Sequence, residues 1–99
     1  MAHFAPGTRA LRTLTAAGKH LSFTRAADEV GLTPAAVSFQ IKEIEDQLGV
    51  KLFTRTSRTM RLTEAGTVLY EAAVDALDIM GRAVAKARKA TRGTAQPKV

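Results

Sequence analysis

Signals for the ends of helices follow one another closely between residues 22 and 34, and they restrict the fold more than any other feature of the chain. Ser22 is suited to cap the start of a helix, and Gly31 is suited to the left-handed turn that ends one. Thr33 and Pro34 then supply a capping side chain and a proline at the first helical position. The spacing predicts a helix over 23–30, a tight turn, and a second helix that begins at Pro34.

Apolar residues in the second of these helices recur at a spacing that places them on one face. They step by four, three and four positions, and they are Val37, Ile41, Ile44 and Leu48. Gly49 then predicts the end of a helix over 34–48, whose apolar face is expected to be buried. A helix-turn-helix needs a small residue where its helices touch, a glycine in the turn and a branched apolar residue in the second helix. Ala27, Gly31 and Val37 meet these requirements.

The segments on either side complete the predicted fold. Apolar residues at helical spacing predict a first helix before Ser22, and they are Leu11, Leu14, Ala17 and Leu21. Residues 51–62 hold two short alternating segments around a polar turn, which predicts a hairpin. Thr63 is placed to cap a last helix that runs to about residue 91, in which Gly66 and Gly81 are expected to mark close packing. The predicted fold class is mainly α, a winged helix-turn-helix of three helices and a two-stranded wing, followed by a long helix.

Length, cysteine content and charge narrow the classes of function. A chain of 99 residues forms one modest core without a deep pocket, and it shows no nucleophile with a paired base, so no enzyme is expected. Cysteine is absent, which excludes a disulfide framework and a thiolate zinc site. Lys and Arg number 15 against 9 for Asp and Glu, a net charge of +6 that suits a nucleic-acid partner. No apolar run approaches the ~18 residues of a membrane span, and we expect a cytoplasmic protein without a metal.

The face of the predicted helix 34–48 opposite its apolar stripe is short and nearly uncharged. It carries Pro34, Ala35, Ser38, Phe39 and Lys42. A solvated face normally carries charges, whereas a helix that enters the major groove of DNA needs short side chains that let its backbone approach the bases. Phosphates would repel the acids that follow, Glu43, Glu45 and Asp46, so only the first two turns are expected in the groove. The exposed Phe39 either packs on a neighbour or contacts a thymine methyl group.

The predicted hairpin is the most basic part of the chain. No acid lies between Asp46 and Glu64, whereas Lys51, Arg55, Arg58 and Arg61 are present. Arg58, near the turn, is expected either to enter the narrow minor groove or to contact phosphates alone. An RNA-binding domain would need an aromatic platform, which the chain lacks. The predicted DNA-binding residues are Thr24, Thr33, Pro34, Ala35, Ser38, Phe39, Lys42, Lys51, Arg55 and Arg58.

The last predicted helix is amphipathic and longer than the body of so small a domain. At ~1.5 Å per residue it measures roughly 40 Å, so much of its apolar stripe should lack cover in a monomer. The stripe contains Leu69, Ala73, Ala76, Leu77, Met80 and Val84. Its charges are acidic up to Asp78 and basic from Arg82 onward, so two antiparallel copies would bring opposite charges together. We expect a homodimer joined by this helix, and the alternative is a protein-interaction module that offers the same face to another partner.

Four segments of the chain closely resemble LysR-type transcriptional regulators. They are Ser22 to Ala27, Thr33 to Lys42, Leu48 to Arg55 and Leu62 to Gly66, in the order and spacing of the family. The resemblance covers residues 8 to 90 and is nearest to the branch that includes the glycine-cleavage activator. We therefore expect a winged helix-turn-helix DNA-binding domain over 1–62, a linker and dimerisation helix over 63–91, and a disordered tail over 92–99.

The resemblance also implies partners and an effector. Members of the family form dimers through their linker helices, pair two dimers on one promoter as a tetramer, and recognise interrupted dyads with a T and an A at the ends. Their small-molecule effector binds a carboxy-terminal domain that this chain lacks, so no cofactor is expected here. Phe39 stands where the family often has Arg or His, and Pro34 where Gln is common. With these departures, fewer side chains can read the bases directly by hydrogen bonds. Sequence specificity is therefore expected to depend more on DNA shape, on contact with thymine methyl groups and on the wing.

Overall fold

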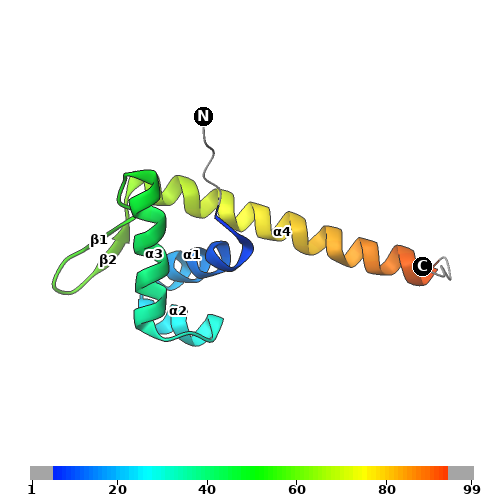
Figure 1. Ribbon diagram of the computed structural model, residues 1–99, viewed down its shortest axis with the longest axis horizontal. Coiled ribbons are helices and arrows are strands. Elements are labelled where there is room, and N and C mark those ends of the chain that lie inside the picture. The colour runs from blue at the N-terminus through cyan, green and yellow to red at the C-terminus, as the bar shows by residue number, and fades with distance from the viewer. Residues whose placement is uncertain (1–5, 94–99) are drawn as a thin grey trace.

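The computed structural model describes the backbone of residues 6–93 and the side chains of residues 6–90. Its elements, in chain order, are α1 (Thr8–His20), α2 (Phe23–Val30), α3 (Pro34–Leu48), β1 (Phe53–Arg55), β2 (Met60–Leu62) and α4 (Glu64–Gly93). The first three helices form a small body, the hairpin β1–β2 stands at one end of it, and α4 runs away from the other (Figure 1). The molecule measures 57 × 36 × 20 Å. Within residues 6–93, no helix combines the length and apolarity needed to cross a membrane.

The predicted helix boundaries around the turn are confirmed, and each has a local cause. The side chains of Ser22 and Thr33 accept hydrogen bonds from the backbone N–H three residues later, at 3.2 and 3.1 Å. Gly31 and Gly49 end α2 and α3 with φ of 74° and 76°, a left-handed conformation that glycine adopts without a steric cost. The end of α1 is different, because Leu21 takes the left-handed position with φ of 50° and is 41 % exposed. Its predicted place on the apolar face of the first helix is therefore wrong.

The core lies where α1, α2 and α3 meet and where the hairpin and α4 close over them. It consists of Leu14, Ala16, Ala17, Ala26, Ala27, Val37, Ile41, Ile44, Leu52, Phe53 and Ala73. Alanines at the contact of α1 and α2 let the two helices approach closely, and the predicted roles of Ala27 and Val37 are confirmed. Leu48 was predicted to be buried with them, but it is 39 % exposed. It stands on the last turn of α3, where the helix extends past the core.

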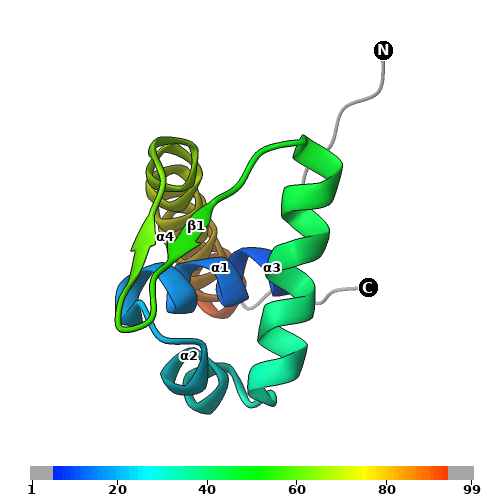
Figure 2. The ribbon, with the colours of Figure 1, turned by 90° about the vertical axis from the view of Figure 1, so that its left-hand side faces the viewer.

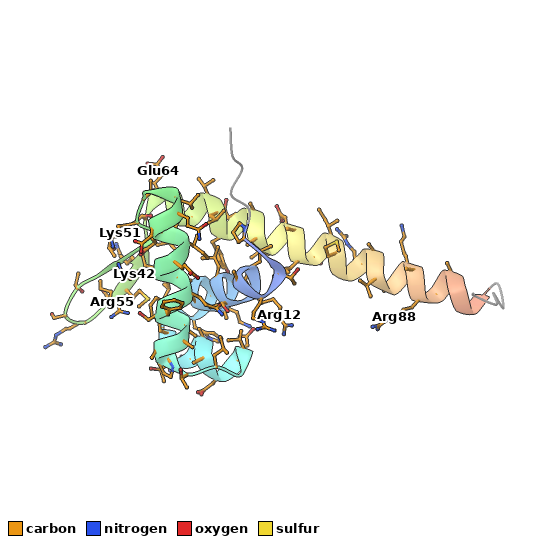
Figure 3. The ribbon with its side chains drawn as sticks, in the orientation of Figure 1. Arg12, Lys42, Lys51, Arg55, Glu64 and Arg88 are labelled. Carbon is orange, nitrogen blue, oxygen red and sulfur yellow. The ribbon has the colours of Figure 1, made fainter. Side chains whose placement is uncertain are left out.

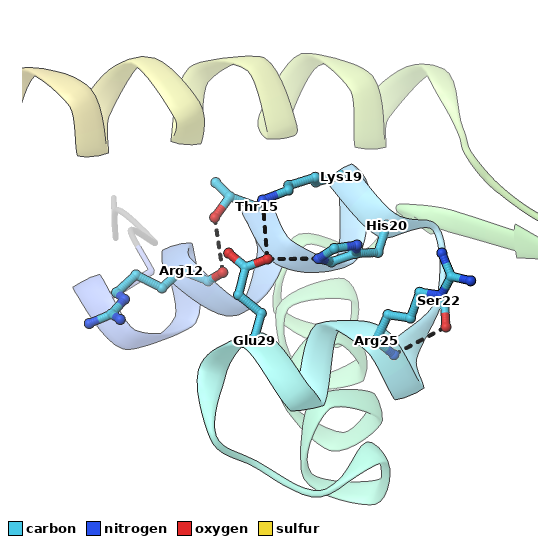
Figure 4. A network of polar contacts seen from close by, with 7 residues as sticks. All are labelled: Arg12, Thr15, Lys19, His20, Ser22, Arg25 and Glu29. Carbon is cyan, nitrogen blue, oxygen red and sulfur yellow. Dashed lines mark hydrogen bonds and ion pairs between the residues drawn. The ribbon is translucent and has the colours of Figure 1, made fainter.

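A polar network ties the end of α1 to the end of α2 (Figure 4). The Glu29 carboxylate lies 2.7 Å from His20 Nε2 and 3.2 Å from Lys19 Nζ. Hydrogen bonds from His20 and then Lys19 hold the pKa of Glu29 below its ordinary value. The network is exposed to solvent, so we regard it as a weak supplement to the alanine contacts beneath it.

The first turns of α4 are part of the body. The Tyr70 ring packs on Gly18 of α1, and Gly66 packs on the backbone carbonyl of Leu52. Close packing at Gly66 is thus confirmed, whereas at Gly81 no described residue outside the chain neighbours and the backbone of α4 itself lies within 4 Å of the place a Cβ would occupy. The predicted division between residues 62 and 63 therefore falls inside one packed unit. The helix extends to Gly93, so residues 92 and 93 of the predicted tail are helical, and residues 94–99 lie outside the described residues.

The two glycines of α4 are expected to respond in opposite directions to the same substitution. In Gly66→Ala the new methyl group meets a backbone carbonyl that cannot swing aside, and such overpacking costs about 1–3 kcal/mol. In Gly81→Ala the methyl group meets nothing and the helix gains roughly 0.5–1 kcal/mol. Urea denaturation midpoints of the two variants measure both effects. A Gly66→Ala variant as stable as the parent would contradict the packing described here.

Candidate nucleic-acid interface

α3 and the hairpin stand at the end of the molecule opposite the projecting part of α4 (Figure 1), and they lie on either side of that end in Figure 2. A groove with a volume of 530 Å³ runs between the start of α2, the start of α3 and the tip of the hairpin. Five of the predicted DNA-binding residues line it: Thr24, Pro34, Ser38, Arg55 and Arg58. Residues from three separate stretches of the sequence thus meet on one concave surface.

A second groove adjoins the first between α3 and β1. Four predicted residues line it: Ser38, Lys42, Lys51 and Arg55. Figure 3 shows Lys42, Lys51 and Arg55 at the same end of the molecule, far from Arg88 on α4. Lys42 pairs with Asp46 at 3.7 Å, and Lys51 with Glu45 at 3.8 Å. The side chains of Lys42 and Lys51 are 66 % and 71 % exposed, so these pairs are weak and leave the charges accessible to an anionic partner.

The hairpin is docked on α2 by aromatic contacts. The Phe23 and Phe53 rings meet edge to face at 5.6 Å between centroids, and the Arg55 guanidinium stands 4.9 Å from the Phe23 centroid. A cation over an aromatic face in an exposed place contributes about 0.5–1 kcal/mol. Arg55 therefore has a defined position on the groove wall.

The turn of the hairpin presents Arg58 at its tip. The backbone N–H of Thr56 donates to the Thr59 carbonyl at 2.8 Å, and the hydroxyl groups of the same two threonines lie 2.8 Å apart. These bonds close the turn with the exposed Arg58 between them. The sequence predicts this turn only as a polar one. The hydroxyl-bearing groove residues Ser22, Thr56, Ser57 and Thr59 were missed. The clustering of Thr56, Ser57 and Thr59 beside Arg58 is visible in the sequence, whereas only the fold brings Ser22 to them.

Three predicted residues, one at the cap of α3 and two on the helix, lie outside both grooves. Thr33 caps the helix, since its hydroxyl oxygen accepts from the Ala36 N–H, and Ala35 is exposed beside it. The Phe39 ring is 65 % exposed, so a neighbour within the chain covers only a minor part of it. Of the two explanations for an aromatic residue at this position, this exposure favours contact with a binding partner over packing on a neighbouring side chain.

Glu45 differs from its predicted role as a repelling acid near phosphates. The residue is 8 % exposed, and its Oε2 accepts hydrogen bonds from the backbone N–H groups of Leu52 and Phe53 at 2.8 and 3.3 Å. The carboxylate faces the base of the hairpin and is buried there, whereas Leu48, predicted to be buried, is exposed. The sequence signal was misleading, because an acid among other acids on a helix is usually solvated.

The predicted dimer face of α4 divides into two parts. Leu69 and Ala73 pack on the core of their own chain, and Ala73 is 2 % exposed, so its assignment to a dimer interface is wrong. Ala76 and Leu77 are half-buried, whereas Met80 and Val84 are 61 % and 43 % exposed beyond the end of the body. Val68 and Ile79 are also exposed, and the predicted stripe did not include them.

Among the described residues, no group of His, Cys, Asp or Glu is placed to hold a metal ion.

Three helices around a tight turn, with a basic hairpin beside the exposed face of the third, define a winged helix-turn-helix protein. Residues 8–67 match the family described as "Bacterial regulatory helix-turn-helix protein, lysR family". The chain belongs to this family.

A similar relative is the glycine cleavage system transcriptional activator of Escherichia coli K12, 59 % identical over 61 residues. The match covers 62 % of this chain and 20 % of that protein, so the chain spans about a fifth of its relative. Among solved structures, the BenM DNA-binding domain in complex with benA site 1 DNA is 31 % identical with a TM-score of 0.83, covering 89 % of this chain and 99 % of that one. The CbnR DNA-binding domain in complex with DNA is 28 % identical with a TM-score of 0.78, covering 87 % and 99 %.

Proposed function

We propose that this chain binds double-stranded DNA as a homodimer and so regulates bacterial transcription. The observation that carries the proposal is the meeting of the nearly uncharged face of α3 and the basic hairpin on two adjoining grooves. Support comes from the likeness to the BenM and CbnR domains, whose structures contain DNA. The names of the relatives describe regulators of transcription, and we assign no catalytic step to the chain.

In the proposed complex the first two turns of α3 enter the major groove. Ala35 and Ser38 are short enough to let the helix backbone approach the bases, and the Phe39 ring reaches a thymine methyl group. Lys42 and Lys51 contact phosphates on either side, which sets register without reading sequence. Arg58, at the tip of the hairpin, reaches the neighbouring minor groove or its phosphates.

The second copy binds through the outer part of α4. The 30 residues of this helix span ~45 Å at ~1.5 Å per residue, and the described residues leave the apolar side chains of Met80 and Val84 61 % and 43 % exposed beyond the body. An antiparallel partner would cover them and would set the acidic first half of one helix against the basic second half of the other. Two recognition helices held in this way read a site with twofold symmetry.

Because the match covers only 20 % of the relative, further properties of the whole protein are proposals as well. They are a small-molecule effector bound outside this chain, a tetramer of two dimers on one promoter, and a cytoplasmic location beside the chromosome.

Salt is expected to weaken duplex binding steeply. Each phosphate contact releases counterions and adds about −0.9 to the slope of log affinity against log salt. Lys51→Ala should reduce the steepness by about one unit if the ammonium contacts one phosphate, with a similar loss of affinity for every duplex. Arg12→Ala, which removes the same charge from an exposed position on α1 outside both grooves, is the control and should leave the slope unchanged. Titrations of a random duplex at several salt concentrations give both slopes, and a flat response of the unmodified protein refutes the proposed function.

A further inference from the structure

The segment that leads from α3 into the hairpin is held from two sides. On one side, Glu45 of α3 accepts the N–H groups of Leu52 and Phe53. On the other, Thr63 at the start of α4 donates its hydroxyl to the Lys51 carbonyl at 2.6 Å and its N–H to the Leu52 carbonyl at 2.9 Å. Consecutive backbone groups of one short segment thus bond to both neighbouring helices.

The Glu45 side of this clamp is strong because the acceptor is charged and shielded. A buried carboxylate is costly unless its oxygens are bonded, and here the two N–H groups and the Lys51 ammonium, at 3.8 Å, compensate it. Hydrogen bonds to an ionised acceptor are roughly twice as strong as those between neutral groups. The carboxylate therefore couples the recognition helix firmly to the base of the hairpin.

We propose that Glu45 is a positioning residue that sets where the hairpin stands relative to α3, and thus which flanking base pairs Arg58 reaches. The inference rests on the proposed function, because it concerns the spacing of two DNA-contacting elements. A carboxylate that bonds to the backbone of residues 52 and 53 acts on flank recognition through the hairpin, whereas its pairing with Lys51 affects phosphate contact and so changes affinity for all duplexes alike. Removal of the Glu45 carboxylate should loosen the position of the hairpin relative to α3, while the face of α3 around Ser38 and Phe39 stays intact.

The test compares two duplexes that share a core site, selected from random sequence by the unmodified protein, and differ only in an A·T-rich or G·C-rich flank. Glu45→Ala is expected to lower the affinity ratio between them by about tenfold, the order of one lost base contact. The ratio is insensitive to a fraction of unfolded protein, because unfolding weakens both duplexes equally. Glu45→Gln should restore most of the ratio, since its amide oxygen can accept both N–H groups. Glu43→Ala, an exposed acid on the same helix, should leave the ratio unchanged.

The position of the hairpin can be read directly as well. The chain has no cysteine, so Ser57→Cys at the turn carries a single iron-chelate cleavage reagent per chain. We expect defined strand cuts in the flank for the parent and a spread of cuts after Glu45→Ala. An unchanged flank ratio or an unchanged cleavage pattern in Glu45→Ala overturns the proposal. Failure of the proposed function shows earlier and separately, as absence of duplex binding by the unmodified protein.

Discussion

Replacing Met80 and Val84 with aspartate is expected to give a folded monomer that binds its DNA site about 10²–10⁴-fold more weakly. Both side chains are largely exposed in the single chain, at 61 % and 43 %, so the body loses little when they change. In the dimer the new carboxylates would be buried against an apolar face, where an unpaired charge is not tolerated. The loss in DNA affinity follows because the second half-site is no longer bound by a tethered partner.

Sedimentation at micromolar concentration measures the first effect, and titration of the selected duplex measures the second. Val74→Asp is the matched control, because Val74 is 41 % exposed but lies roughly a quarter to a third of a turn around the same helix from Met80 and Val84, and it should leave the dimer intact. A double variant that stays dimeric contradicts the assignment of the interface. A parent that is monomeric at the same concentration would instead favour the alternative of a face that docks another protein.

Replacing Phe39 with alanine is expected to cost about 1–3 kcal/mol at the selected site and to relax preference at one or two base pairs. The ring is 65 % exposed and contributes little to the core, so the variant should remain as stable as the parent. Affinity for random duplexes should change little, because nonspecific binding depends on phosphate contacts rather than on a methyl contact.

Lys51→Ala is the informative counterpart, since it should weaken selected and random duplexes alike. Phe39→Leu keeps an apolar contact of smaller area and should fall between the parent and Phe39→Ala. Binding of the variants to the selected site, to sites with single base changes and to random duplexes separates these outcomes. If Phe39→Ala and Lys51→Ala give the same pattern across all three, α3 does not enter the major groove as proposed.

Much of the fold follows from local features of the sequence. The caps at Ser22 and Thr33 act over three residues, and the glycines at positions 31 and 49 adopt a backbone conformation that other residues avoid, so neither depends on distant contacts. The period of the apolar residues in α3 then fixes which face turns inward. The opposite face and the basic hairpin could be recognised as candidate DNA-binding elements before their mutual arrangement was known.

Only the tertiary structure decided which side chains contact one another, because such contacts depend on how far each neighbouring helix or strand extends. Leu48 continues the apolar period of α3 but lies beyond the core, while Glu45 is buried because the base of the hairpin offers it two N–H groups. Gly66 and Gly81 look alike in the sequence, yet only Gly66 touches a backbone carbonyl. Likewise the periodic stripe of α4 runs unbroken, but the body covers Ala73 and stops before Met80. The spacing of apolar residues in the sequence predicts which way a side chain points. Whether that side chain is buried depends on how far the neighbouring elements extend over it.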